Sequence, residues 1–166
     1  HQPVFSQDRS VVAVCNGEIY NFAEIAAELE ANGIFLRSQS DVEVIPHLYQ
    51  SLGLDFVKRL RGMFAIALWD RELKQLILAR DRVGKKPLFY SQANGHLIFA
   101  SQARALLAAG MDRSLNLEAL DHVLGFCYAP FQRIGDQYPK RSLYGYRCGG
   151  YVRGCFWKWH VALQKD

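Results

Sequence analysis

The sequence predicts an α+β fold, in which helices cover a mostly antiparallel sheet. Between about residues 21 and 53, apolar residues recur at the spacing of amphipathic helices. After that point the pattern changes to compact apolar runs of strand length, joined by short polar turns. The expected order is therefore one strand, two helices, several antiparallel strands and two further helices.

The first strand is expected at residues 10–15, a run rich in β-branched valine. Residues 16–17 are Asn-Gly, a common turn sequence, so the strand is predicted to end there. Asn21 is expected to cap the first helix together with Glu24, three residues later, as in a capping box. Gly33 is expected to end this helix.

The second helix is predicted to begin at Asp41 and to end before Gly53. Its apolar residues recur at helical spacing and give it one hydrophobic face. These residues are Val42, Ile45, Leu48, Tyr49 and Leu52. A further short helical turn is expected over residues 55–61.

The change of period after the second helix predicts two antiparallel hairpins. The strand-length runs are residues 63–69, 75–79, 87–91 and 96–100. The second hairpin surrounds Asn94-Gly95, a turn sequence that suits tightly connected strands. Helices are expected at residues 102–109 and 116–126, with Gly110 between them.

Length and composition restrict the class of protein. The chain has 166 residues, half of them hydrophobic, which is enough for the core of one domain. No apolar stretch approaches the roughly 20 residues of a membrane helix, so no membrane association is expected. The four cysteines lack metal-site spacing, so no metal site is predicted, and free thiols favour a cytoplasmic location. Because the chain begins with His1 and not Met, we interpret it as a fragment.

The positive charge is concentrated near the end of the sequence. Residues 131–166 hold 7 basic and 2 acidic side chains, whereas residues 1–130 hold 13 and 14. Three interpretations stay open: a divergent linker, a shifted reading frame or sequence error, or a basic aromatic arm for nucleic acid. Binding to nucleic acid is not expected, because no other feature of the sequence indicates it.

Four residues are candidates for a functional site. A backbone that turns at Gly17 could aim a free N–H and the side-chain amide of Asn16 into one pocket, and these are the two donors that an oxyanion needs. Glu18, beside them, and Asp41, at the start of the second helix, could bind an ammonium group. Simpler explanations stay open at this point, since Asn-Gly is an ordinary turn and Asp41 suits a helix N-terminus.

A third polar segment, residues 80–87, combines charge, glycine and proline between two strands. A phosphate-binding nest is one interpretation, but no helix is predicted after Gly84 and the P-loop pattern is absent. A structural hairpin held by pairing between arginine and aspartate is therefore favoured.

Together these segments carry a family resemblance. In order along the chain, they are Asn-Gly-Glu-Ile-Tyr-Asn (16–21), Arg-Ser-x-Ser-Asp-x-Glu-Val (37–44), Leu-Arg-Gly-Met-Phe-Ala-x-Ala-Leu-Trp-Asp (60–70), Ala-Arg-Asp-Arg-x-Gly-x-Lys-Pro-Leu-x-Tyr (79–90) and Phe-Ala-Ser (99–101). From His1 to about Leu107 the sequence resembles the class II glutamine amidotransferase domain of glutamine-hydrolysing asparagine synthetases. We therefore expect a partial domain of this type at residues 1–126 and a divergent basic linker toward a synthetase domain at residues 127–166.

The resemblance implies an N-terminal-nucleophile hydrolase fold, a four-layer αββα sandwich of antiparallel sheets, here incomplete at the N-terminus. It implies that Asn16 and Gly17 form the oxyanion hole, and that Glu18 and Asp41 bind the α-ammonium group of glutamine. The nucleophile of such domains is the thiol of an N-terminal Cys. The ammonia would pass to a synthetase domain, which uses ATP and Mg²⁺ to convert aspartate to asparagine.

Three departures from the family pattern limit what this chain is expected to do. The N-terminal Cys and the Arg that holds the glutamine carboxylate are missing, so the chain alone is expected to be inactive. The ATP-binding Ser-Gly-Gly-x-Asp-Ser loop is also missing, so no cofactor is expected in this chain. Gln102 stands where the family usually has Glu.

Two alternatives to a silent enzyme fragment follow from these departures. The chain could be a binding module that holds an amino acid or a partner without hydrolysis, and the parent could use another acceptor, as β-lactam synthetases do. Cys15 could replace the lost nucleophile, but alternation along a strand would point it away from the side chain of Asn16. We therefore expect Cys15 to be a buried strand residue.

Overall fold

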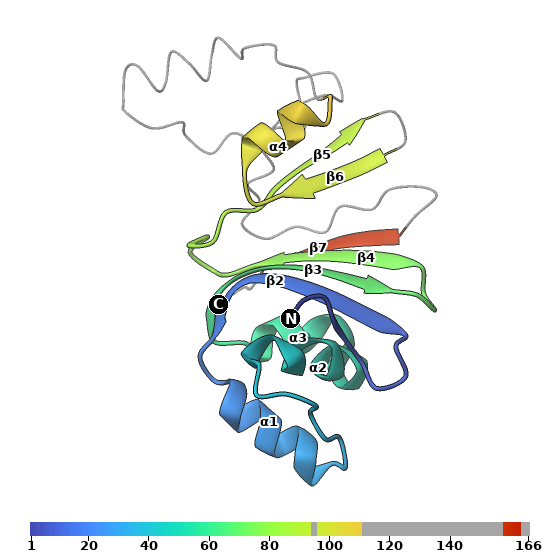
Figure 1. Cartoon of the computed structure of the whole chain (residues 1–166), viewed down its shortest axis with the longest axis vertical. Helices are drawn as coiled ribbons and strands as arrows, with labels where there is room; N and C mark the ends of the chain where they lie inside the picture. Colours follow the sequence, from blue (N-terminus) through green and yellow to red (C-terminus); the bar gives the residue numbers. More distant parts are fainter. Residues whose placement is uncertain (94–95, 111–157, 164–166) are drawn as a thin grey trace. The chain divides into compact units, whose positions relative to one another are not determined.

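The computed structural model describes residues 1–93, 96–110 and 158–163, which are coloured in Figure 1. The chain divides into two compact units, residues 1–87 with 148–166 and residues 88–147. Each unit contains strands and helices or turns of helix within the described residues. The predicted α+β class is therefore confirmed.

The first unit contains a five-stranded sheet in the order β1-β2-β3-β4-β7. Its strands are β1 (Val4–Phe5), β2 (Val11–Ile19), β3 (Gly62–Asp70), β4 (Gln75–Arg80) and β7 (Lys158–Leu163). The pairs from β1 to β4 are antiparallel, whereas β4 and β7 are parallel. The predicted hairpin of residues 63–69 and 75–79 is thus confirmed, and a segment near the end of the chain joins the same sheet.

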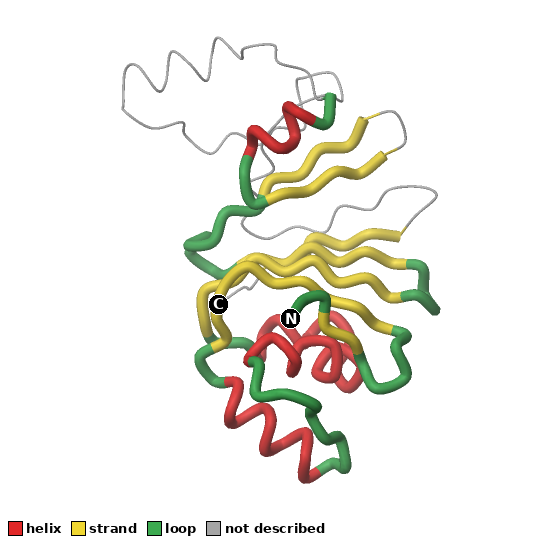
Figure 2. Tube along the Cα trace, viewed as in Figure 1, coloured by secondary structure: helices red, strands yellow, loops and turns green. Residues whose placement is uncertain are grey.

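Helices of the first unit lie on one side of this sheet, as Figures 1 and 2 show. They are α1 (Phe22–Ala31), η1 (Asp41–Glu43), α2 (Val44–Leu52), η2 (Gly53–Asp55) and α3 (Phe56–Arg59). These bounds match the two predicted helices and the short helical turn that follows them. Helix α2 contacts β2, while α1 packs against α2.

The core forms between α2, α3 and the sheet because strand residues alternate between two faces. In β2, the odd-numbered residues Val11, Ala13, Cys15 and Ile19 are buried, whereas Val14, Asn16 and Glu18 are exposed. The buried face meets Ile45 and Leu48 of α2 and Phe56 of α3, all nearly inaccessible. Burial of this apolar surface, worth about 25 cal/mol per Å², holds the helices on the sheet.

The prediction of a turn at Asn16-Gly17 is wrong. Strand β2 continues to Ile19, and Gly17 lies opposite Phe64 of β3. A Cβ atom on Gly17 would lie 1.9 Å from the carbonyl oxygen of Met63, and Gly17 has a φ of 146°. Glycine is therefore needed here for the close approach of two strands and not for a change of direction.

The predicted capping box at Asn21 is also wrong, although the helix begins where expected. Asn21 makes no side-chain cap to α1. Its Nδ2 donates to the carbonyl of Arg59 at 3.0 Å, and its Oδ1 accepts from the N–H of Arg61 at 2.8 Å. Glu24 pairs with the guanidinium of Arg61 at 2.7 Å. These side chains join the start of α1 to the connection between α3 and β3, contacts that local sequence cannot reveal.

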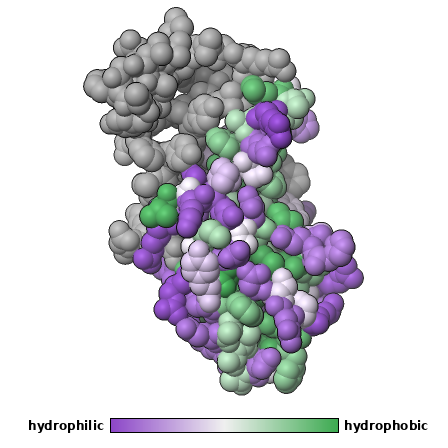
Figure 3. Space-filling model, turned by 60° about the vertical axis from the view of Figure 1, so that its left-hand side comes forward, coloured by the Kyte–Doolittle hydropathy of each residue, from purple (hydrophilic) through white to green (hydrophobic). Residues whose placement is uncertain are grey.

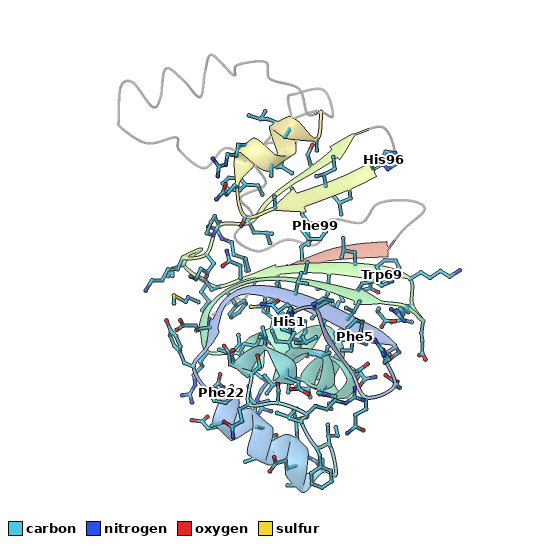
Figure 4. All side chains as sticks on the ribbon, viewed as in Figure 1. His1, Phe5, Phe22, Trp69, His96 and Phe99 are labelled. Atoms are coloured by element: carbon cyan, nitrogen blue, oxygen red, sulfur yellow. The ribbon has the colours of Figure 1, made fainter. Side chains whose placement is uncertain are left out.

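The second unit contains a hairpin of β5 (Phe89–Ala93) and β6 (His96–Ala100), followed by α4 (Ala103–Ala108). Both the hairpin and the helix were predicted, and Figure 4 labels His96 and Phe99 on β6. The helix predicted at residues 116–126 lies outside the described residues. At the start of α4, the Oε1 atom of Gln102 accepts a hydrogen bond from Arg104 at 2.6 Å.

Hydrophilic and hydrophobic side chains are interspersed over the described part of the face in Figure 3. Such a mixed surface is ordinary for a protein in water. Among the described helices, none is long and apolar enough to cross a membrane.

Candidate functional site

The backbone of β2 presents an edge that faces away from β3. Opposite residues of an antiparallel pair either exchange both hydrogen bonds or exchange none. Phe64 lies opposite Gly17. Its C=O accepts a hydrogen bond from the backbone N–H of Asp81 at 2.9 Å, and its N–H donates to the carboxylate of Asp81 at 3.2 Å. The N–H and C=O of Gly17 therefore point away from β3, as do those of the other odd-numbered residues of β2.

Most of these outward groups have partners within the described residues. The N–H of Val11 donates to the Ser6 hydroxyl at 3.0 Å, and β1 pairs with the strand at Ala13. The amide side chain of Gln2 bonds both backbone groups of Cys15, at 2.6 and 2.8 Å. The N–H of Ile19 donates to a carboxylate, as described next.

Asp41 binds this edge from another element. Its Oδ2 atom accepts a hydrogen bond from the N–H of Ile19 at 2.8 Å. Ser40 is the cap residue of η1 and makes no side-chain cap, while Asp41 lies in the first turn, where a negative charge is favourable. The bond brings the start of η1 beside the candidate residues of β2, 22 residues earlier in the sequence.

The outward N–H and C=O of Gly17 lie between these two contacts. Gln2 occupies the edge on one side, at Cys15, and Asp41 occupies it on the other, at Ile19. Within the part of the chain that the structure describes, Gly17 has no hydrogen-bond partner on this edge. Figure 4 labels His1, the neighbour of Gln2, in the segment that runs beside the sheet.

Asn16 and Glu18 flank Gly17, and both side chains are exposed. As neighbours of Gly17 in a strand, they project to the same face of the sheet, opposite to the helices. All four predicted residues therefore lie together: Gly17 and Asp41 at the strand edge, and Asn16 and Glu18 on the adjoining outer face. The grouping offers hydrogen-bond donors next to two carboxylates, which suits a ligand with a carbonyl and an ammonium group.

Cys15 lies on the other face, against the helices, as expected from strand alternation. Its side chain is 8% exposed. Burial, reinforced by the nearby carboxylate of Asp41 and opposed by Lys86, raises the pKa of the Cys15 thiol to about 12. A thiol that stays protonated at neutral pH is a poor nucleophile, so Cys15 fits a structural role.

Glu43 was not predicted from the sequence as part of this region. Its buried carboxylate accepts from the N–H groups of Arg37 and Ser38, at 2.7 and 2.9 Å, and from the Ser38 hydroxyl. Burial alone would raise the pKa of Glu43, but these bonds outweigh it and hold the pKa below its ordinary value. The contacts fix the loop before Asp41, and its position in the 37–44 motif was the signal for this.

Gln2 was missed as well. A glutamine side chain that replaces a backbone partner has no local signature in the sequence.

The loop at residues 80–87 is structural. Oxygens of the Asp81 carboxylate accept from the N–H groups of Lys85 and Lys86, at 2.8 and 3.0 Å. The guanidinium of Arg80 donates to the carbonyls of Gly84 and, at 2.6 Å, of Lys86. The two amides that a phosphate nest would need are therefore already bonded to a carboxylate, and the side chains of Arg80 and Asp81 both bind backbone groups.

No cluster of three or more His, Cys, Asp and Glu side chains suited to a metal ion occurs among the described residues. The candidate residues at the β2 edge offer backbone groups, an amide and carboxylates.

The glutamine amidotransferase domain family matches residues 1–137 of this chain. The chain belongs to this family. The asparagine synthetase [glutamine-hydrolyzing] 2 of Bacillus subtilis (strain 168) is 47% identical over 107 residues, 64% of this chain and 14% of the relative. Asparagine synthetase [glutamine-hydrolyzing] 1 of the same organism is 36% identical over 140 residues, 84% of this chain and 22% of the relative. The amidotransferase chain thus spans less than a quarter of the length of either relative.

Another relative of the amidotransferase chain is amidase chyE of Penicillium rubens, 40% identical over 111 residues, which cover 67% of this chain and 16% of that protein. Among solved structures, glutamine phosphoribosylpyrophosphate amidotransferase from B. subtilis, complexed with ADP and GMP, matches with a TM-score of 0.58 and 25% identity. The match covers 66% of this chain and 26% of that one. The chain is thus similar to differently named enzymes in both sequence and structure.

Proposed function

We propose that this amidotransferase domain binds glutamine and takes part in the hydrolysis of its side-chain amide. The observation that carries the proposal is the outward N–H of Gly17, which lies between Gln2 and Asp41 without a partner among the described residues. A carbonyl bound there would find the amide of Asn16 on the neighbouring residue. The names of the relatives, two of which include glutamine hydrolysis, support the same ligand.

The N–H of Gly17 and the Nδ2 of Asn16 would stabilise the oxyanion that forms when the amide carbon is attacked. Donors fixed before the reaction lower the barrier because they need not reorganise, and one such donor is worth about 10²–10³ in rate. The strand pairing of residues 16–18 with β3 supplies this rigidity. Glu18 and Asp41 would bind the α-ammonium group through charge-assisted hydrogen bonds.

The attacking group in this proposal is not Cys15, which is buried on the opposite face of β2. It is the N-terminal cysteine thiol typical of the family, which is not among these 166 residues. Its sulfur would bond to the amide carbon, and the C–N bond would break as the nitrogen takes up a proton and leaves as ammonia. Water would then hydrolyse the thioester to glutamate.

The ammonia would pass to a synthetase domain for the amidation of aspartate, with ATP and Mg²⁺ bound there. The four-layer αββα arrangement and the domain boundary near residue 126 belong to the same proposal. Relatives named as asparagine synthetases support the link to a synthetase domain, while the family match extends past this boundary, to residue 137.

A binding experiment tests the proposal. We expect glutamine to shift the NMR amide signals of residues 16–19 and 41, and the Asp41→Asn change to weaken binding at least about tenfold. Asp55→Asn is the control, since Asp55 is an exposed acid that pairs with Lys58. Equal binding by the wild-type and Asp41→Asn chains would contradict the assigned site.

Ammonia release separates hydrolysis from mere binding. We expect none from this chain with glutamine, and release once the family's N-terminal Cys segment is joined to His1. Release from the chain as it stands, abolished by Cys15→Ala, would refute the assignment of the nucleophile. Glutamine binding without release after the segment is restored would favour a binding module.

A further inference from the structure

We propose that Gly17 selects a primary carboxamide over an ester or a carboxylate by using both of its backbone groups. Its N–H would donate to the carbonyl oxygen of the ligand, and its C=O would accept from the ligand NH₂. The C=O of Gly17 is then a specificity-determining group. The inference rests on the proposed function for the identity of the ligand. The hydrogen-bonding pattern that it uses is already present within the chain, between Gln2 and Cys15.

The observation behind it is the contact between Gln2 and Cys15. The N–H of Cys15 donates to Oε1 of Gln2 at 2.6 Å, and Nε2 of Gln2 donates to the carbonyl of Cys15 at 2.8 Å. One carboxamide thus bonds both backbone groups of one strand residue, as an opposite strand residue would. The β2 edge already binds a glutamine side chain in this way.

The same arrangement of groups recurs at Gly17. Backbone orientation repeats every second residue of a strand, so Gly17 presents its N–H and C=O about 7 Å farther along the same edge. Gly17 is only partly buried, and its place on the edge has no occupant among the described residues. Because Asp41 takes the N–H of Ile19, the vacant length of edge is one residue long.

A donor and an acceptor side by side discriminate between ligands. A carboxamide matches them with its C=O and NH₂. A carboxylate has only acceptors, so one oxygen would face the lone pairs of the Gly17 carbonyl, and a methyl ester leaves that carbonyl without a donor. An unmatched polar group costs more than a hydrogen bond gains, which makes this kind of discrimination strong.

Three ligands test the inference on the ¹³C,¹⁵N-labelled chain: glutamine, glutamate γ-methyl ester and glutamate. We expect glutamine to shift both the amide signal and the carbonyl-carbon signal of Gly17, and to bind at least about tenfold more tightly than the ester. If the ester binds as well as glutamine, or only the N–H signal shifts, the inference is overturned. If glutamine shifts neither Gly17 nor Asp41, the proposed function itself fails.

The internal pair gives a second arm that needs no ligand. Gln2→Glu places a carboxylate against the carbonyl of Cys15, whereas a protonated carboxyl again offers one donor and one acceptor. The folded-state pKa of the introduced carboxyl should therefore be raised, so the variant is stable below the ordinary glutamate pKa and loses stability as pH rises through the folded pKa. Gln39→Glu, at an exposed position, is the control.

Urea unfolding between pH 3 and 7 measures this arm. We expect the unfolding midpoint of Gln2→Glu to approach that of wild type at the acid end and to fall below it at neutral pH, with no such trend in Gln39→Glu. The same pH trend in both variants would overturn the claim that this edge distinguishes a carboxamide from a carboxylate.

Discussion

The β2 edge and the loop at residues 80–87 contain the same kinds of groups but differ in what remains available for a ligand. Both combine a glycine at positive φ, an aspartate and backbone amides. In the loop, Asp81 binds the N–H groups of Phe64, Lys85 and Lys86. On the edge, Asp41 binds one N–H, that of Ile19, and the next outward N–H, at Gly17, is left without a partner within the described residues.

The difference shows that residue types alone do not mark a site. Asp81 is 3% exposed, and its bonds serve the fold. Asp41 is only partly buried, and it stands beside a backbone donor that the fold does not use. A ligand can bind only to hydrogen-bonding groups that folding leaves unpaired and accessible. Substitutions in the 80–87 loop should therefore lower stability, whereas substitutions at the β2 edge should also weaken ligand binding.

The largest effect on the free energy of unfolding is expected from the Gly17→Ala substitution. Its methyl group would lie 1.9 Å from the Met63 carbonyl oxygen, a backbone atom that cannot turn away. We expect a loss of about 4 kcal/mol or more in the free energy of unfolding, or no folded protein. Gly84→Ala is the matched change: its Cβ would meet the Arg80 side chain at 2.7 Å, and we expect a loss of about 2 kcal/mol. Urea unfolding followed by circular dichroism measures both.

This pair of variants distinguishes a rigid strand contact from an adaptable loop contact. If the Gly17→Ala variant were as stable as the Gly84→Ala variant, β2 and β3 could not approach each other as closely at Gly17 as they do in the structure. The oxyanion-hole assignment would then lose its rigid support.

The second prediction contrasts the two aspartates. Asp81→Ala leaves three N–H groups without their acceptor and should cost about 3–5 kcal/mol of stability. Asp41→Ala removes one bond at a partly exposed edge and should cost about 1 kcal/mol, yet it should weaken glutamine binding at least about tenfold. Denaturation and titration of both variants give the comparison. A large loss of stability in Asp41→Ala with glutamine affinity intact would reverse the roles given to the two regions.

The positions of most described helices and strands could be predicted from the sequence, because the spacing of apolar residues follows the buried face of each helix or strand. Residues 42–52 and 63–79 show this, since their apolar spacing is set by the helix and strand that they form. The turn expected at Asn16-Gly17 failed because Asn-Gly is a local signal, whereas the strand there is set by pairing with β3, more than 40 residues later.

The candidate site was only partly accessible to sequence reasoning. The grouping of Glu18 with Asp41 was implied by the family resemblance, and the hydrogen bond from Ile19 to Asp41 now gives its physical basis. Gln2 had no such signal, and Glu43 was marked only by its place in the 37–44 motif. Both act through their side chains on the backbone of other segments, and such contacts leave no periodic trace in a sequence.

A third prediction concerns acid, and it involves the segment that positions Asp41. Burial lowers the pKa of His47, although the carboxylate of Glu43 opposes this. With a depressed pKa in the folded state, His47 takes up its proton in the unfolded chain first, so stability falls as pH drops below about 6.5. The slope from one group is at most about 1.4 kcal/mol per pH unit.

Glu43 adds a second phase at lower pH, because its folded pKa is also depressed. Its contribution is complete above the ordinary glutamate pKa and is lost as pH falls through the folded value. Unfolding curves from pH 8 to 3 should show both phases, with the first reduced in His47→Gln and the second in Glu43→Gln. An unchanged first phase in His47→Gln would assign it to another group.

The smallest effect on function is expected from substitution of Cys15, the cysteine two residues before Gly17 in β2. Its thiol is buried and its pKa is raised to about 12, so the thiol stays almost entirely protonated at pH 8. Iodoacetamide should therefore label Cys15 far more slowly in the folded chain than in urea, as peptide mass spectrometry can measure. Cys15→Ala should cost about 1 kcal/mol of stability and leave glutamine binding unchanged. Rapid labelling of Cys15 in the folded chain, slowed by glutamine, would instead show that the thiol lies next to the ligand. The buried face of β2 could then no longer be distinguished from its open edge.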